Sequence, residues 1–199
     1  MKIKQIESIL KSKKTIIILN TPSCQWLGDG AAFYPVYNLP KLTQENIFTI
    51  FDIPEDKRDK FFFSERETPH HINFDDNDES EQLLDRNKFI DIFAYGSVLE
   101  ALATSDGISF IDTRYLKPFA DIETGCELYE RIDKKGETYI AAKSGMLIIG
   151  IIKPYDRLIN EGFIQALENM LNLSRTALFN KEKRTPPEND PDQVTMTDE

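Results

Sequence analysis

The chain has 199 residues, enough for one domain or two small ones. Its formal net charge of −10 excludes a generally basic coat for nucleic acid and leaves only a local basic face. Two cysteines are too few for a disulfide framework, and the first residues lack the pattern of a signal peptide. The longest apolar run, residues 146–152, is too short to span a bilayer. We therefore expect a cytoplasmic protein with free thiols and no membrane partner.

The first part of the chain predicts helices and strands in alternation. Isoleucine and leucine recur at helical spacing from Ile3 to Leu10 and indicate a short amphipathic helix. Thr43 is expected to cap a second helix that ends at Pro54. Apolar β-branched runs and the hairpin turn Gly28-Asp29-Gly30 predict strands. These strands are expected at residues 14–20, 24–27, 31–37 and 60–66.

The second part of the chain predicts mostly strands, which are separated by glycine-containing turns. The expected strands are residues 88–95, 98–104, 108–112, 127–133, 137–143 and 146–153. A short helical segment is expected near residues 114–121, and a helix over residues 156–179 has an apolar face. Residues 181–199 have almost nothing to bury and are expected to be disordered.

An acidic segment separates these two parts. Residues 74–81 are dense in Asp and Glu and show no apolar period, which is typical of a solvated linker. The sequence therefore predicts four regions. They are a first α+β unit with a basic N-terminal helix (1–74), an acidic linker (75–87), a second α+β unit with a C-terminal helix (88–179) and a disordered acidic tail (180–199).

One sequence pattern occurs twice. Residues 29–39 align without gaps on residues 106–116, and in both copies an Asp-Gly turn precedes a strand with Phe at the same offset, Phe33 or Phe110. A Leu follows at a matched position, with a Pro shortly after. The alternative is coincidence, because Asp-Gly hairpins are common, but the matched order of elements favours duplication. The expected fold class is α+β, with two sequence-related β-β-β-α-β units, antiparallel sheets and a C-terminal helix.

No motif for catalysis, phosphate binding or zinc binding is present in the sequence. We therefore predict no catalytic residue, no cofactor and no metal ligand. His70 and His71 are adjacent on an extended segment and point to opposite sides, which is unfavourable for joint ligation. Asp112, Asp121 and Glu123 show no pairing that would define an active site. An enzyme with an unrecognised site stays a third hypothesis.

Candidate binding residues lie on the first helix and near the Asp-Gly turns. Trp26 and Tyr115 are candidates for binding a partner protein, and Trp is enriched at interaction hot spots. For Trp26 the alternative is packing in the core. The best local basic cluster can follow a DNA backbone without reading its sequence, and the alternative is a solvated helix face. This cluster consists of Lys4, Lys11, Lys13 and Lys14.

Residues 107–119, which read Gly-Ile-Ser-Phe-Ile-Asp-Thr-Arg-Tyr-Leu-Lys-Pro-Phe, resemble the strand-then-helix segment of DNA sliding clamps. The strands that follow, which end in the apolar run of residues 148–154, are similar to the closing strands of those clamps. The resemblance covers about residues 14–154 and implies a ring of repeated units that encircles duplex DNA and tethers a polymerase. The first unit departs from it by lacking closing strands, the second lacks a long basic helix, and the 156–179 helix is extra. The whole chain also resembles uncharacterised prophage proteins of Gram-positive bacteria, which imply no activity.

The leading hypothesis is a non-enzymatic, clamp-like accessory protein of phage-type DNA replication or recombination. Such a protein would be a homo-oligomer, turn its N-terminal lysines toward duplex DNA and tether a polymerase or another replication protein. The alternative is a monomeric acidic binding protein that inhibits a host nucleic-acid-binding protein. Residues 74–81 and the tail beyond Thr185 motivate that alternative.

Overall fold

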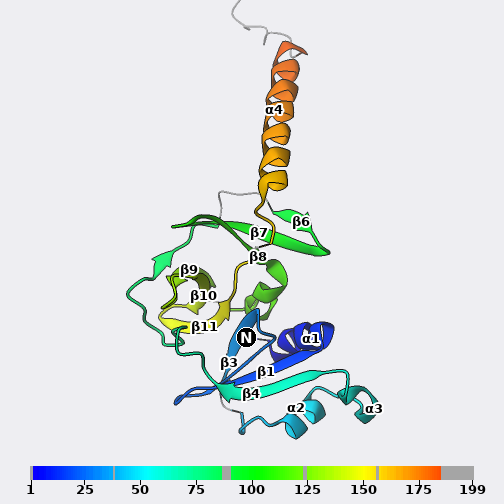
Figure 1. The fold of residues 1–199 in the computed structure, drawn as a ribbon, viewed down its shortest axis with the longest axis vertical. Coiled ribbons are helices and arrows are strands. Elements are labelled where there is room, and N and C mark those ends of the chain that lie inside the picture. The colour runs from blue at the N-terminus through cyan, green and yellow to red at the C-terminus, as the bar shows by residue number, and fades with distance from the viewer. Residues whose placement is uncertain (1, 38, 87–90, 123–124, 156, 185–199) are drawn as a thin grey trace, which may run out of the picture. The chain divides into compact units, whose positions relative to one another are not determined.

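The computed structural model describes residues 2–37, 39–86, 91–122, 125–155 and 157–184 (Figure 1). The chain divides into two compact units, Met1–Asp156 and Arg157–Glu199. The expected α+β class is confirmed, because antiparallel-rich sheets combine with several helices. Among the described helices, none is both long enough and apolar enough to cross a membrane.

The elements expected in the first part of the chain are present. Helix α1 buries Ile6, Ile9 and Leu10 and ends at Lys14, whose left-handed backbone (φ 51°) closes the last turn. Helix α2 begins with a reciprocal capping box, in which the side chains of Thr43 and Asn46 each accept from the other's backbone N–H. The elements are α1 (Ile3–Lys13), β1 (Thr15–Asn20), β2 (Gln25–Gly28), β3 (Ala32–Val36), α2 (Gln44–Ile50), α3 (Glu55–Arg58) and β4 (Phe62–Glu67).

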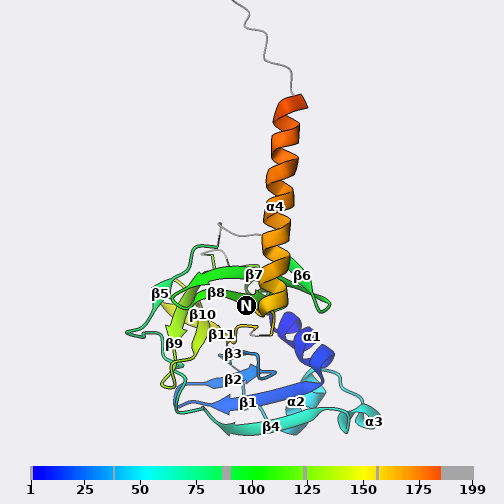
Figure 2. The same cartoon turned by 45° about the horizontal axis from the view of Figure 1, so that its top comes forward.

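An eight-stranded sheet forms the larger part of the first unit, in the order β4-β1-β2-β3-β11-β10-β9-β5 (Figure 2). Its later strands are β5 (Gln82–Leu83), β9 (Glu127–Ile132), β10 (Thr138–Ser144) and β11 (Leu147–Ile152). The β1–β4 pair is parallel and the other pairs are antiparallel. Apolar clusters bury β1 side chains from alternate positions, Ile16 and Ile18 in one cluster and Ile17 and Leu19 in the other.

A three-stranded antiparallel sheet lies in the same unit. It consists of β6 (Ile92–Ala94), β7 (Ser97–Thr104) and β8 (Gly107–Asp112), in that order. The 3₁₀ helix η1 (Thr113–Phe119) follows β8 directly. The backbone N–H of Lys2 donates to the Pro118 carbonyl, which ties the start of the chain to η1.

The expected boundaries at residues 74 and 88 do not separate the sheets. β3 from the first part pairs with β11 from the second, so one sheet contains strands from both. The acidic segment is also not a solvated linker. Asp76 accepts from the Ile148 backbone N–H, and Glu81 pairs with the side chains of Arg131 and Lys143. The acidic segment is therefore held in place by these polar contacts.

The two Asp-Gly sequences occupy corresponding places, at the turns of the β2–β3 and β7–β8 hairpins. The hairpins then differ, because β3 lies inside the larger sheet and β8 is an edge strand of the smaller one. Duplication of a whole unit stays a prediction.

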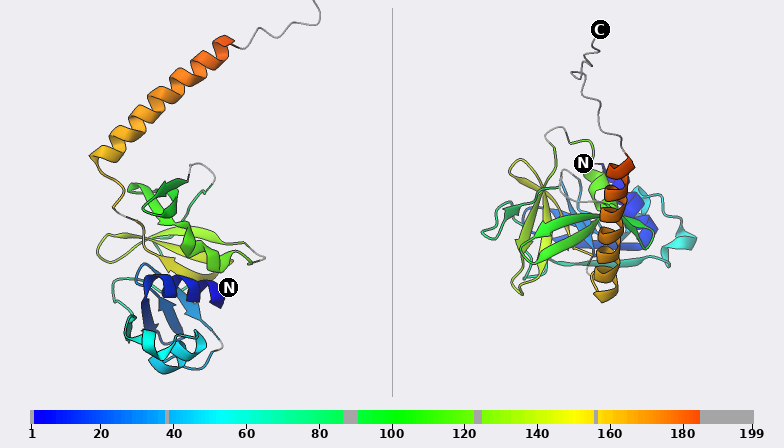
Figure 3. Two further views of the ribbon diagram at one scale, coloured as in Figure 1. Left: turned by 90° about the vertical axis from the view of Figure 1, so that its right-hand side faces the viewer. Right: turned by 90° about the horizontal axis from the view of Figure 1, so that it is seen from above.

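The expected C-terminal helix is present as α4, Glu161–Arg184, a single continuous helix (Figure 3). It begins later than expected. It also includes residues 180–184, which the sequence predicts to belong to the disordered tail. The remainder of the expected tail and residues 88–90 of the expected strand 88–95 lie outside the described residues, as does Glu123.

Candidate functional site

A cavity of about 300 Å³ lies where α1, the β2–β3 turn, the β6–β7 turn, η1 and the end of β11 meet. We call it the Lys13 cavity. Basic and aromatic side chains from four separate stretches of the chain line it: Lys13, Tyr95, Arg114, Tyr115, Lys153 and Tyr155. Positive charge beside exposed aromatic rings is the combination with which proteins bind single-stranded nucleic acids.

Two tyrosines form the open wall of this cavity. The ring centroids of Tyr95 and Tyr155 are 5.8 Å apart, with 34° between the ring planes. Tyr95 is 73% exposed because it occupies a tight hairpin turn with Gly96, and both residues have positive φ angles of 51° and 77°. The Tyr155 backbone N–H donates to the Phe110 carbonyl and fixes the segment after β11. A flat ring face is thus available to a ligand.

An ion pair forms the polar floor of the cavity. The guanidinium of Arg114 donates to both carboxylate oxygens of Asp112, at 2.9 and 3.0 Å from Nε, and to the Ser97 hydroxyl. Burial raises the pKa of Asp112, but hydrogen bonds from Arg114 and Ser97 outweigh it and hold the pKa below its usual value. Asp112 therefore compensates the charge of Arg114, and Lys13 and Lys153 add two ammonium groups to the lining.

Tyr115 joins the two copies of the repeated pattern. Its hydroxyl donates to Asp29 Oδ2 at 2.8 Å, and its carbonyl accepts from the Tyr34 hydroxyl at 2.9 Å. Asp29 Oδ1 in turn accepts from the backbone N–H groups of Ala31 and Ala32. Burial raises the pKa of both tyrosines, so their hydroxyls stay protonated. Tyr115 is buried, so it holds the cavity together and does not present a surface for a partner.

The lysines predicted to contact DNA differ in their surroundings. Lys13 lines the cavity, whereas the ammonium group of Lys11 pairs with Glu7 at 2.5 Å one turn earlier in α1. Lys4 and Lys14 are exposed and do not line the cavity. That the four lysines form one DNA-contacting surface stays a prediction, and of the four only Lys13 also lines the Lys13 cavity.

Trp26 is a core residue. Its side chain is 1% exposed and packs edge-on against Phe74, with the ring centroids 4.9 Å apart. The prediction that Trp26 is a surface anchor for a partner is wrong in this structure, because the acidic segment that contains Phe74 covers it.

Sequence reasoning missed Tyr95, Arg114, Lys153 and Tyr155. They are far apart in the chain or stand alone among apolar residues, so no local pattern connects them. The only available signal was Tyr95-Gly96, a turn sequence that exposes its aromatic side chain.

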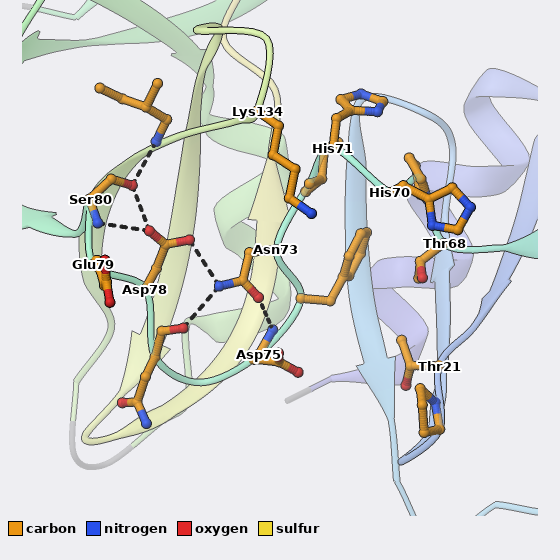
Figure 4. Close-up of a pocket in the computed structure, with 16 residues that line it drawn as sticks. Thr21, Thr68, His70, His71, Asn73, Asp75, Asp78, Glu79, Ser80 and Lys134 are labelled. Atoms are coloured by element: carbon orange, nitrogen blue, oxygen red, sulfur yellow. Dashed lines mark hydrogen bonds between the residues drawn. The ribbon is translucent and has the colours of Figure 1, made fainter.

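A larger, more open groove of about 910 Å³ lies beside residues 68–80 (Figure 4). The rings of His70 and His71 lie apart in it. Asp78 accepts from Ser80 and Asn73, which lower its pKa although burial raises it. No group of three or more His, Cys, Asp or Glu side chains within the described ranges is arranged to hold a metal ion. The carboxylate of Asp78 therefore stabilises the local backbone through its hydrogen bonds with Asn73 and Ser80.

We expect Cys126 to react slowly with iodoacetamide in the folded protein. Burial raises the pKa of this thiol to about 11, which leaves little thiolate at pH 8. Its alkylation should be roughly 100-fold slower than in the urea-unfolded chain, where the ordinary thiol pKa returns. Mass spectrometry of the labelled peptides measures both rates. Equal rates in the folded and unfolded chain would contradict the expected burial.

Comparisons with protein-family models, curated proteins and solved structures find no match to this chain. The functional argument therefore rests on the chemistry of the Lys13 cavity.

Proposed function

We propose that this protein is a non-enzymatic accessory protein that acts in the cytoplasm, in phage-type DNA replication or recombination. It binds a DNA backbone at the Lys13 cavity and tethers a polymerase or another replication protein there. The observation that carries the proposal is the meeting of Lys13 and Lys153 with the open Tyr95–Tyr155 pair in one cavity.

The chemistry of the cavity favours DNA with an unpaired segment. The ammonium groups of Lys13 and Lys153 attract phosphates and release their counterions. An aromatic face stacks on a base only when that base is accessible, as in a single strand or at a frayed end. Since the rest of the chain is acidic, binding is confined to this local patch.

The clamp-like part of the proposal is supported by the segment that carries the resemblance. Residues 107–119 form β8 followed directly by η1, a strand and then a short helix. Encirclement of DNA is tested by comparing the retention of the protein on nicked circular DNA with its retention on linear DNA. Equal release from both would restrict the proposal to tethering without a ring.

We expect charge reversal at both cavity lysines, Lys13→Glu with Lys153→Glu, to abolish most binding of a labelled oligonucleotide. The logarithm of the binding constant falls with the logarithm of the salt concentration, and this slope should become less steep by about one unit for each lysine that contacts a phosphate. Fluorescence anisotropy with single-stranded and duplex probes over a range of salt measures both quantities. Removal of the exposed ring by Tyr95→Ala should weaken binding of the single strand more than binding of the duplex.

The matched control for this experiment is Lys4→Glu, which reverses an exposed charge on the same helix away from the cavity. It should leave the affinity nearly unchanged. An equal loss in Lys4→Glu would indicate a diffuse attraction, and no loss in the double variant would refute the proposed site. Circular dichroism confirms that each variant is folded.

The inhibitor hypothesis receives less support from the acidic segment. A surface that imitates nucleic acid needs free carboxylates, whereas Asp76, Asp78 and Glu81 accept hydrogen bonds from the chain itself. The part of the tail beyond Thr185 lies outside the described residues.

A further inference from the structure

Helix α4 is 24 residues long and carries exposed apolar side chains on one face between Ile164 and Leu178. We define the α4 stripe as the apolar Ile164, Leu167, Leu171 and Leu178 together with the small polar Ser174. These positions alternate in steps of three and four, so all of them lie on one face of the helix. Phe163 and Met170 widen the same face. Ile164 is 50% exposed and Leu178 is 58% exposed.

A step pattern of three and four averages 3.5 residues, which is the period of a coiled-coil seam. A single helix has little stability in water, and most helices in proteins are stabilised by packing an apolar face. An exposed, mainly apolar face of this length is typical of an interaction surface. The pattern therefore indicates that α4 packs on another helix.

The charges beside the stripe select the orientation of that helix. Glu168 and Arg175 lie on the same flank of the stripe, seven residues apart. In an antiparallel pair of α4 helices, Glu168 of one copy faces Arg175 of the other, and twofold symmetry makes this ion pair twice. In a parallel pair, Glu168 and Arg175 would instead lie opposite uncharged residues of the other flank, which are Phe163, Met170 and Ala177.

The apolar layers agree with the same register. Leu167 lies opposite Leu178 of the second copy, and the small Ser174 lies opposite Leu171. Lys181 lies opposite Ile164 near the end of the helix, where its long side chain can reach water. One antiparallel register thus satisfies both the apolar layers and the charges.

We propose that the occupant of the α4 stripe is a second copy of this chain, and that α4 forms an antiparallel two-helix coiled coil that makes the protein a homodimer. The proposal is independent of the Lys13 cavity and of DNA binding. A dimer also brings two copies of the cavity into one particle, which raises the apparent affinity for a ligand with several binding sites.

Light scattering after size exclusion tests this proposal on the full chain. We expect twice the monomer mass of 22.9 kDa at micromolar concentrations. The double variant Leu167→Glu with Leu171→Glu should be a monomer, because it places charges inside the seam. Leu173→Glu changes an exposed leucine outside the stripe and should remain a dimer. A wild-type monomer, or a dimer that persists in the double variant, would overturn the proposal.

A charge swap tests the orientation. Glu168→Arg alone replaces two attractions by two repulsions and should weaken dimerisation about tenfold. Addition of Arg175→Glu restores the attraction with reversed signs and should recover the dimer. A double swap that behaves like the single variant would exclude the antiparallel register. Binding of α4 to lipid vesicles as a monomer would exclude self-association.

Discussion

Replacement of Glu81 by alanine is expected to lower the free energy of unfolding by about 3–5 kcal/mol. Its carboxylate accepts from Arg131 Nε at 2.9 Å and from Lys143 Nζ at 2.6 Å. Arg131 is fully buried and Lys143 is nearly so. Without Glu81, two buried cations would lose their common counter-charge and repel each other. The melting temperature, followed by circular dichroism, should fall by roughly 10 °C.

Glu79→Ala is the matched control for this change, because it removes an exposed carboxylate from the same acidic segment. It should change stability by no more than about 0.5 kcal/mol. If Glu79→Ala and Glu81→Ala had equal effects, the acidic segment would act through its overall charge, as a solvated linker does. A large difference between them supports a specific buried network.

Trp26→Ala should also destabilise the protein strongly, by about 3–5 kcal/mol. Trp26 is among the largest fully buried side chains, and its removal leaves a cavity against Phe74 in the apolar cluster that also contains Phe33. Urea denaturation followed by circular dichroism measures the change. Fluorescence is unsuitable for the variant, because Trp26 is the only tryptophan of the chain.

An exposed aromatic residue of the same sheet provides the comparison. Phe62 lies on the edge strand β4 and is exposed, so Phe62→Ala should cost much less than Trp26→Ala. Unchanged stability in Trp26→Ala would contradict the core position and return Trp26 to the role of a partner anchor.

Local patterns were sufficient to predict most elements of the fold. The isoleucine spacing of α1 and the glycine turns of the hairpins act within a few residues, and both were located correctly. The short elements α3 and β5 were missed. β5 consists only of Gln82 and Leu83, and a strand of two residues is too short to show a period.

Long-range pairing explains the errors. The acidic segment looks solvated when its charges are counted alone, and its partner Arg131 is 50 residues beyond Glu81. Arg131 itself lies in the stretch Glu-Leu-Tyr-Glu-Arg-Ile, which has no strict alternation that would indicate its burial. The Lys13 cavity could not be predicted from the sequence for the same reason. Lys13 was identified on its helix, but the side chains that the fold brings next to it lie in distant parts of the chain.

The place of β11 in the larger sheet has a consequence for synthesis of the chain. β3 is made early, and its free edge is closed by β11, which follows roughly 110 residues later. At ordinary rates of translation this delay is on the order of ten seconds. During that time the backbone groups along one side of β3 have no strand partner, and such an open edge pairs readily with other chains. The nascent protein is therefore most exposed to aggregation before its last strand leaves the ribosome.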